Sequence, residues 1–97
     1  MADFAPTHPG EVLREDFMKP MGLTQYALAK ALRVNQIRVS EIVNGKRAVS
    51  PDTALRLARY FGTSAEFWMG MQATYDLETA RDQLGEAIAG QIAPRAA

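Results

Sequence analysis

The sequence predicts an all-α domain built as a bundle of five short helices. Apolar residues recur at helical spacing in five successive segments, and each segment lies between residues typical of helix starts and stops. No run of β-branched residues alternates with polar ones between turn signals, so no strand is expected. The 97 residues suffice for one domain, which we assign to residues 8–78.

The first helix is expected to begin at His8-Pro9-Gly10-Glu11. Proline suits the first helical position, and an acid in the first turn interacts favourably with the helix dipole. Pro20 and Gly22 are expected to end this helix. Apolar residues at helical spacing lie between these signals: Val12, Leu13, Phe17 and Met18. Residues 1–7 before it are expected to form a flexible N-terminus.

The second and third helices are predicted over about residues 24–32 and 36–43, with Thr24 and Asn35 as their N-caps. Asn44-Gly45 is a strong stop signal after the third. The residues expected to face the core are Leu28, Ala29 and Leu32 in the second helix and Val39, Ile42 and Val43 in the third.

The fourth helix is predicted to start at Ser50-Pro51-Asp52 and to end at Gly62. Its expected apolar face consists of Ala54, Leu55, Leu57, Ala58 and Phe61. The segment Thr63 to Glu66 has the pattern of a capping box and opens the fifth helix, which runs to about residue 78. Residues 79–97 form a C-terminal extension, in which 79–90 either continue this helix or form a weak further turn before a partly disordered tail.

The stretch from Gln25 to Asn44 has the pattern of a helix-turn-helix, in which two short helices cross steeply around a turn of three to four residues. Ala29 supplies the small side chain that the crossing requires, and Val34 supplies an apolar plug for the turn. Arg33 stands where most such turns carry glycine, because the backbone there is left-handed. A non-glycine residue costs about 1 kcal/mol at that position, which a fold can absorb. The combination predicts DNA binding.

Charge is distributed unevenly along the chain, although the net charge is zero. Residues 23–62 carry seven basic side chains against two acidic ones, whereas residues 1–22 and 63–97 both carry an acidic excess. The basic middle segment coincides with the helix-turn-helix, as a polyanionic partner requires.

The outward face of the third helix carries the residue types that read bases. Gln36 can pair with adenine, Arg38 with guanine, and Ser40 with several bases. Thr24 and Gln25, at a helix N-terminus, are placed to meet a phosphate. Asn44, Lys46 and Arg47, beyond the third helix, can also hold backbone phosphates.

Composition argues against an enzyme, a metal centre or a cofactor site. The chain has no cysteine, and its single histidine, His8, is better explained as a helix-start residue than as a metal ligand. Nucleotide-binding and hydrolase motifs are also missing from the sequence. No apolar run approaches the length of a membrane span, and the N-terminus does not resemble a signal peptide, so a cytoplasmic location and no membrane partner are expected.

The fifth helix carries more bulky apolar side chains than one face of a short helix can bury. Core packing alone could account for them, but we favour packing in the core together with a homodimer interface. The residues assigned to that interface are Phe67, Trp68, Met71 and Tyr75. A dimer also suits DNA binding, since two recognition helices about 34 Å apart read a palindrome.

The sequence resembles the HigA antitoxins, a branch of the Xre/Cro-type helix-turn-helix family with a lambda-repressor-like domain. The resemblance covers about residues 8–77. It is carried by His8 to Glu11, Leu23 to Gln25, Leu28-Ala29, Val39 to Arg47, Ser50 to Ala58, Phe67-Trp68 and Tyr75 to Leu77.

The resemblance implies a dimer that binds a palindrome in its own promoter, represses its operon, and neutralises a HigB-type toxin, an mRNA-cleaving nuclease related to RelE. Carried over residue by residue, the DNA contacts fall on Thr24, Gln25, Asn35, Gln36, Arg38, Ser40, Asn44, Lys46 and Arg47. Two alternatives stay open: a stand-alone Xre-type regulator without a toxin, and an interaction bundle that binds no DNA. The basic middle segment argues against the second.

Overall fold

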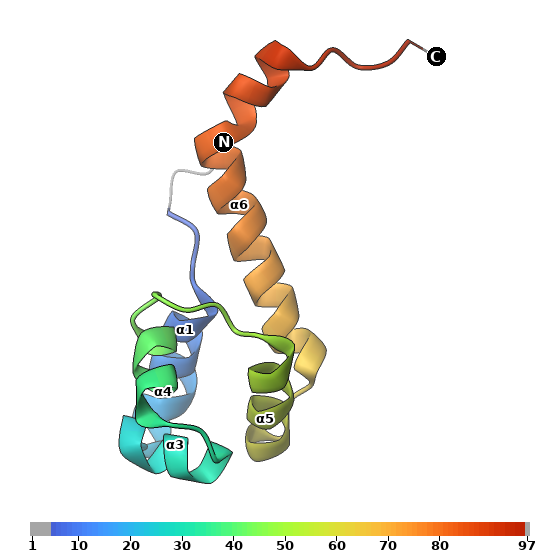
Figure 1. The fold of residues 1–97 in the computed structure, drawn as a ribbon. Coiled ribbons are helices and arrows are strands. Elements are labelled where there is room, and N and C mark those ends of the chain that lie inside the picture. The colour runs from blue at the N-terminus through green and yellow to red at the C-terminus, as the bar shows by residue number, and fades with distance from the viewer. Residues whose placement is uncertain (1–4, 97) are drawn as a thin grey trace.

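The computed structural model describes residues 5–96, and all regular secondary structure in that range is helical (Figure 1). The segments are α1 Pro9–Val12, η1 Leu13–Met18, α2 Lys19–Met21, α3 Gln25–Leu32, α4 Gln36–Val43, α5 Pro51–Phe61 and α6 Ala65–Gln91. Because α1, η1 and α2 follow one another without a break, they form one helix. The five predicted helices of an all-α domain are therefore confirmed.

The first helix contains a wider middle turn and ends later than Pro20. The Lys19 N–H donates to the Arg14 carbonyl, five residues back, so η1 is π-helical. Pro20 is the second residue of α2, and the helix continues past it to Met21. The expectation that Pro20 takes part in ending the helix was wrong, and Gly22, with a φ of 64°, is the stop.

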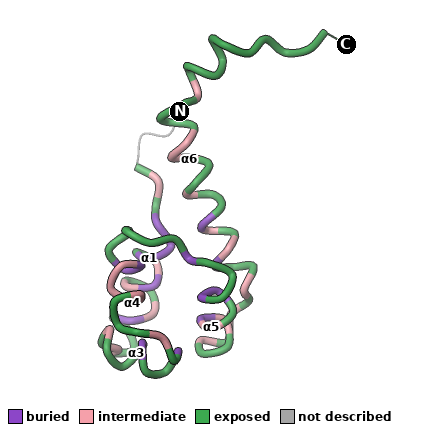
Figure 2. Tube along the Cα trace, viewed as in Figure 1, coloured by how far each residue is buried: buried purple, intermediate pink, exposed green. Residues whose placement is uncertain are grey.

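The first four helices pack into a small bundle, and α6 leans against it with its first half only (Figure 1). The second half of α6 projects away from the bundle and is mostly exposed (Figure 2). The molecule is consequently elongated, with extents of 53 × 26 × 21 Å.

Each of the five helices contributes to the core a large side chain that is at most 2% exposed: Leu13, Leu28, Ile42, Leu57 and Trp68. Trp68 packs against the ring of Phe17 at a centroid distance of 5.2 Å. Its indole N–H donates to Thr63 Oγ1 at 2.8 Å. Because Trp68 is fully buried within its own chain, its assignment to the dimer interface was wrong.

The predicted N-caps of α3, α4 and α5 are confirmed. The side chains of Thr24, Asn35 and Ser50 each accept a hydrogen bond from the backbone N–H three residues on. The predicted capping box was wrong, because Ser64 and not Thr63 caps α6, and the third helical residue is then Phe67, whose side chain cannot complete a box. Thr63 instead supplies the acceptor for the buried indole of Trp68.

The predicted apolar face of α5 was wrong in one residue. Leu55 is 64% exposed, whereas Ala54 and Leu57 are fully buried. Consecutive helical residues point about 100° apart, so Leu55 lies beyond the edge of the stripe centred on its neighbours.

The structure gives the extent of regular secondary structure at both ends of the chain. The last helix does not stop near residue 78 but continues to Gln91, which is one of the two alternatives for residues 79–90. Residues 92–96 have no regular secondary structure, and neither do residues 5–8. Residues 1–4 and 97 lie outside the described residues, so the flexible N-terminus stays a prediction there.

The first helix meets α4 through Gly10. A Cβ atom at Gly10 would overlap the carbonyl oxygen of Ile42, in the last turn of α4. Since backbone faces backbone at this point, no side-chain rotation can relieve the overlap.

We therefore expect Gly10→Ala to destabilise the protein by about 2 kcal/mol or more, because overpacking against backbone forces two helices apart. Gly90→Ala is the matched control, since nothing lies within 4 Å of its added Cβ and alanine is favoured in helices. Urea unfolding followed by circular dichroism gives both values. Equal stabilities of the two variants would contradict the close approach.

Candidate nucleic-acid interface

The helix-turn-helix predicted from the sequence is present. The helices α3 and α4, each of eight residues, are joined by the turn Arg33 to Asn35. Arg33 has a φ of 58°, which confirms the left-handed backbone expected at this position. Ala29 is buried at the crossing, and Val34 packs against the core as the plug of the turn. The α4 helix therefore occupies the place of a recognition helix.

The outward face of α4 presents polar groups at two depths. Gln36 is exposed, as is the apolar side chain of Ile37 beside it. Arg38 and Ser40 are half-buried. Gln36 is thus free to move, whereas Arg38 is restrained by the protein itself.

The restraint on Arg38 comes from α5. The Arg38 Nη1 donates to Asp52 Oδ2 at 2.7 Å and to Thr53 Oγ1 at 3.4 Å, and both acceptors lie on α5. Asp52 also accepts from Arg56 Nε at 3.0 Å. Both arginines hold the pKa of the Asp52 carboxyl below its usual range, with the hydrogen bond from Arg56 as the larger cause. Sequence reasoning missed Asp52, because only the fold brings it to Arg38.

The phosphate-contact candidates lie at two ends of the motif. Thr24 is exposed and caps α3, next to the half-buried Gln25. Asn35 is exposed and caps α4 through its side-chain oxygen Oδ1, so the cap does not use its side-chain N–H donors. Each of these polar groups lies beside the N-terminus of a helix, where backbone N–H groups favour anions.

The loop after α4 carries the remaining candidates, and all three side chains are exposed: Asn44, Lys46 and Arg47. Arg47 is paired with Glu41 at 2.7 Å. Lys46 forms no ion pair within the described residues. The loop therefore offers one unpaired ammonium group and one guanidinium that already has a partner.

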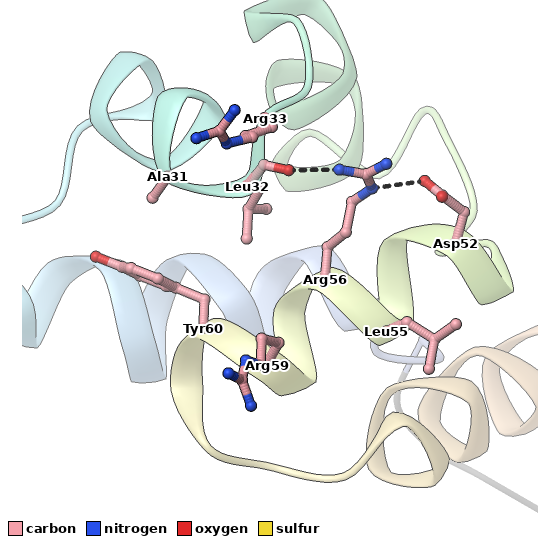
Figure 3. A pocket seen from close by; sticks show the side chains of 8 residues that line it. All are labelled: Ala31, Leu32, Arg33, Asp52, Leu55, Arg56, Arg59 and Tyr60. Carbon is pink, nitrogen blue, oxygen red and sulfur yellow. Dashed lines mark hydrogen bonds and ion pairs between the residues drawn. The ribbon is translucent and has the colours of Figure 1, made fainter.

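A second group of cations lies between the end of α3 and the outer face of α5. Arg33, Arg56 and Arg59 line an open cavity of about 570 Å³ there, together with Tyr60 (Figure 3). Arg56 Nη1 donates to the Leu32 carbonyl at 2.8 Å, which fastens α5 to the C-terminal end of α3. No three potential metal-ligating side chains gather anywhere in residues 5–96.

His8 connects the first helix to the loop after α4. Its Nδ1 accepts from the Gly10 N–H at 2.9 Å, which confirms the helix-start role. Its ring meets Tyr75 edge-on at 4.8 Å, and it lies beside Gly45. Burial lowers the pKa of His8 below 6.5, against the opposing charge of Asp76. The imidazole is therefore held in its neutral form.

Comparison with known proteins identifies the family to which the chain belongs. A helix-turn-helix family model matches residues 15–68. Virulence-associated protein I of Dichelobacter nodosus is 58% identical over 73 residues, which are 75% of this chain and 68% of the relative. Antitoxin HigA-1 of Vibrio cholerae is 38% identical over 81 residues, which are 84% and 76% of the two chains. The chain belongs to the HigA group of the helix-turn-helix family.

Solved structures of antitoxins agree with this assignment over almost the whole chain. The Pseudomonas aeruginosa antitoxin HigA with the higBA promoter is 45% identical, with a TM-score of 0.92 over 94% of this chain and 99% of that one. The antitoxin GraA in complex with its operator is 42% identical, with a TM-score of 0.91 over 100% and 98%. A relative without an antitoxin name, the HTH-type transcriptional regulator YbaQ of Escherichia coli, is 38% identical over 74% of this chain and 64% of its own.

The HigA group is one of DNA-binding regulators and not of enzymes. None of the described helices combines the length and the apolar character that crossing a membrane requires.

The His8 cap predicts a pH dependence of stability. The folded-state pKa lies below the unfolded value of 6.5, so the unfolded chain binds the proton more readily. Stability should be complete above about pH 7.5 and should fall as the pH drops through 6.5, because a protonated Nδ1 cannot accept from Gly10. Urea midpoints at pH 7.5 and 5.5 measure the loss. His8→Asn retains a capping side chain that does not titrate in this range, and an equal loss in that variant would assign the effect to other groups.

Proposed function

We propose that this chain is the antitoxin of a toxin–antitoxin pair, which binds a palindromic operator as a homodimer and represses its own operon. The observation that carries the proposal is the polar face of α4 in a chain that matches operator-bound and promoter-bound antitoxins over 94–100% of its length. Besides operator DNA, the antitoxin binds a HigB-type, mRNA-cleaving toxin and holds it inactive. Since operator DNA and mRNA both lie in the cytoplasm, that is where the protein acts.

In this proposal the DNA contacts divide into two classes. Gln36, Arg38 and Ser40 read base edges in the major groove from the outward side of α4. The remaining contacts position the protein on the backbone and carry no sequence information. They are Thr24, Gln25, Asn35, Asn44, Lys46 and Arg47.

The homodimer forms through the exposed side of α6. Phe67 and Met71 line an apolar cavity of about 700 Å³ between α6 and residues 5–7, and Phe67 is 40% exposed. Tyr75 lies half-buried one turn further on. Leu84 and Ile88 form a second exposed apolar face on the projecting half of the helix, where they are 51% and 47% exposed. A second copy that covers these side chains removes apolar surface from water.

The second candidate function is a stand-alone regulator without a toxin, which the similarity to YbaQ favours. Co-expression with the product of the neighbouring gene separates the two. Co-purification of a nuclease whose activity is blocked supports the antitoxin, and a partner-free repressor supports the alternative.

The division of contacts predicts two different mutant phenotypes. Arg38→Ala should relax the preference for one base pair by about five- to hundredfold, because a bidentate guanine contact is lost. Lys46→Ala should weaken binding to all sequences alike and reduce the salt slope by about one. Fluorescence anisotropy with operator and scrambled duplexes at two salt concentrations measures both. Equal, unselective losses from the two substitutions would refute the division.

The α6 interface predicts that Leu84→Glu raises the dimer dissociation constant by at least about tenfold, since a charge would be buried in an apolar contact. Gln83→Glu is the control, because it adds the same charge at an exposed position on a side of the same helix that carries none of the proposed interface residues. Sedimentation equilibrium gives both constants. A Leu84→Glu variant that dimerises as well as the Gln83→Glu variant would exclude this half of α6 from the interface.

A further inference from the structure

We infer that Asp52 is a positioning residue that fixes the Arg38 guanidinium for base reading and thereby sets the sequence preference of the protein. The inference rests on the proposed function, in which Arg38 reads a base. Asp52 itself touches no base in this account and acts through Arg38 alone.

The contacts with α5 leave the Nε and Nη2 donors of Arg38 available for a base. Both acceptors on α5, Asp52 Oδ2 at 2.7 Å and Thr53 Oγ1 at 3.4 Å, receive their hydrogen bonds from Nη1. Nε and Nη2 make no hydrogen bond within the described residues. A guanidinium has five N–H donors in a fixed plane, and guanine takes only two of them through O6 and N7. Arg38 can therefore be held from one side and still present two donors to a base.

Asp52 is itself held in place by the fold. It is the second residue of α5, directly after the Ser50 cap and Pro51. The same Oδ2 that accepts from Arg38 also accepts from Arg56 Nε, and Arg56 reaches the Leu32 carbonyl of α3 (Figure 3). Asp52 thus links the recognition helix to α3 through two arginines, and its carboxylate cannot move away without breaking its hydrogen bonds to both.

The charge of Asp52 points to a role in specificity. An acid beside a DNA-binding helix repels phosphates, so it lowers the affinity for DNA of any sequence. Within residues 23–62 only two acids occur, Glu41 and Asp52, and each is paired with an arginine of the candidate interface. An exposed ion pair contributes little to stability, which leaves orientation as the benefit. A fixed guanidinium loses less conformational entropy when it meets its base.

The test compares full-length wild-type protein with Arg38→Ala, Asp52→Asn and the double variant. Duplexes from the protein's own upstream region, each with one base pair exchanged, and a scrambled duplex serve as ligands in fluorescence anisotropy. Thermal unfolding of each variant confirms that the fold is kept. Asp52→Asn should lower the ratio of operator to scrambled affinity by about tenfold, with the loss at the base pair that Arg38→Ala identifies. The double variant should be no less specific than Arg38→Ala.

Glu41→Gln is the matched control, because it removes the same charge from the same surface but frees Arg47, a phosphate contact. It should strengthen binding to all duplexes without changing base preference. Asp52→Glu, which keeps the charge, should restore part of the preference that Asp52→Asn loses.

Three outcomes would overturn the inference. If Arg38→Ala changes the preference and Asp52→Asn does not, the inference fails while the proposed function stands. If Asp52→Asn sharpens the preference and strengthens operator binding, Asp52 holds Arg38 away from DNA. If Arg38→Ala leaves every preference unchanged, the role proposed for Arg38 fails, and the inference fails with it.

Discussion

The contact between Gly10 and the Ile42 carbonyl is the constraint on which the DNA-reading surface depends. It brings the start of the first helix onto the last turn of α4, closer than any side chain would allow. Arg14 Nη1 adds a hydrogen bond to the Val43 carbonyl at 3.2 Å, one residue further along the same helix end. The Val43 carbonyl, which the helix itself leaves without a partner, is thus satisfied by the first helix. The Ile42 carbonyl accepts from the Gly45 N–H at 3.0 Å, within the turn that ends α4.

The same contact determines the position of the loop that follows. His8 lies two residues before Gly10 and beside Gly45, which has a φ of 72° and turns the chain out of α4. The Lys46 N–H donates to the Glu41 carbonyl at 2.8 Å, so the turn is closed by backbone bonds. The Lys46 and Arg47 side chains leave this turn toward solvent. A loop anchored in this way can hold phosphate-binding groups at a fixed position relative to α4.

How much of this could be predicted from the sequence depends on the range of the interaction. The Thr24, Asn35 and Ser50 caps, like the left-handed Arg33, depend on residues no more than four positions away, and all four were predictable. The capping box was ambiguous because Thr63 and Ser64 are both good capping residues, and the buried indole of Trp68 decided between them. The side of α6 that faces the core was not readable either, since apolar residues occur around much of that helix. The Arg38–Asp52 pair joins residues fourteen positions apart, and no local pattern indicates it.

The long α6 helix connects the reading surface to the region proposed for dimerisation. Gln72 is buried on its inner side and accepts from the Val49 N–H at 2.8 Å, just before the Ser50 cap of α5. Through Arg56, α5 is fastened in turn to α3. Because α3 packs against α4, these contacts join the recognition helix to α6 through α3 and α5. In a two-fold dimer, the angle at which two such helices cross therefore determines the separation of the two reading surfaces, and that separation has to match the half-site spacing of the operator. A dimer interface on α6 thus contributes to the choice of operator although it touches no DNA.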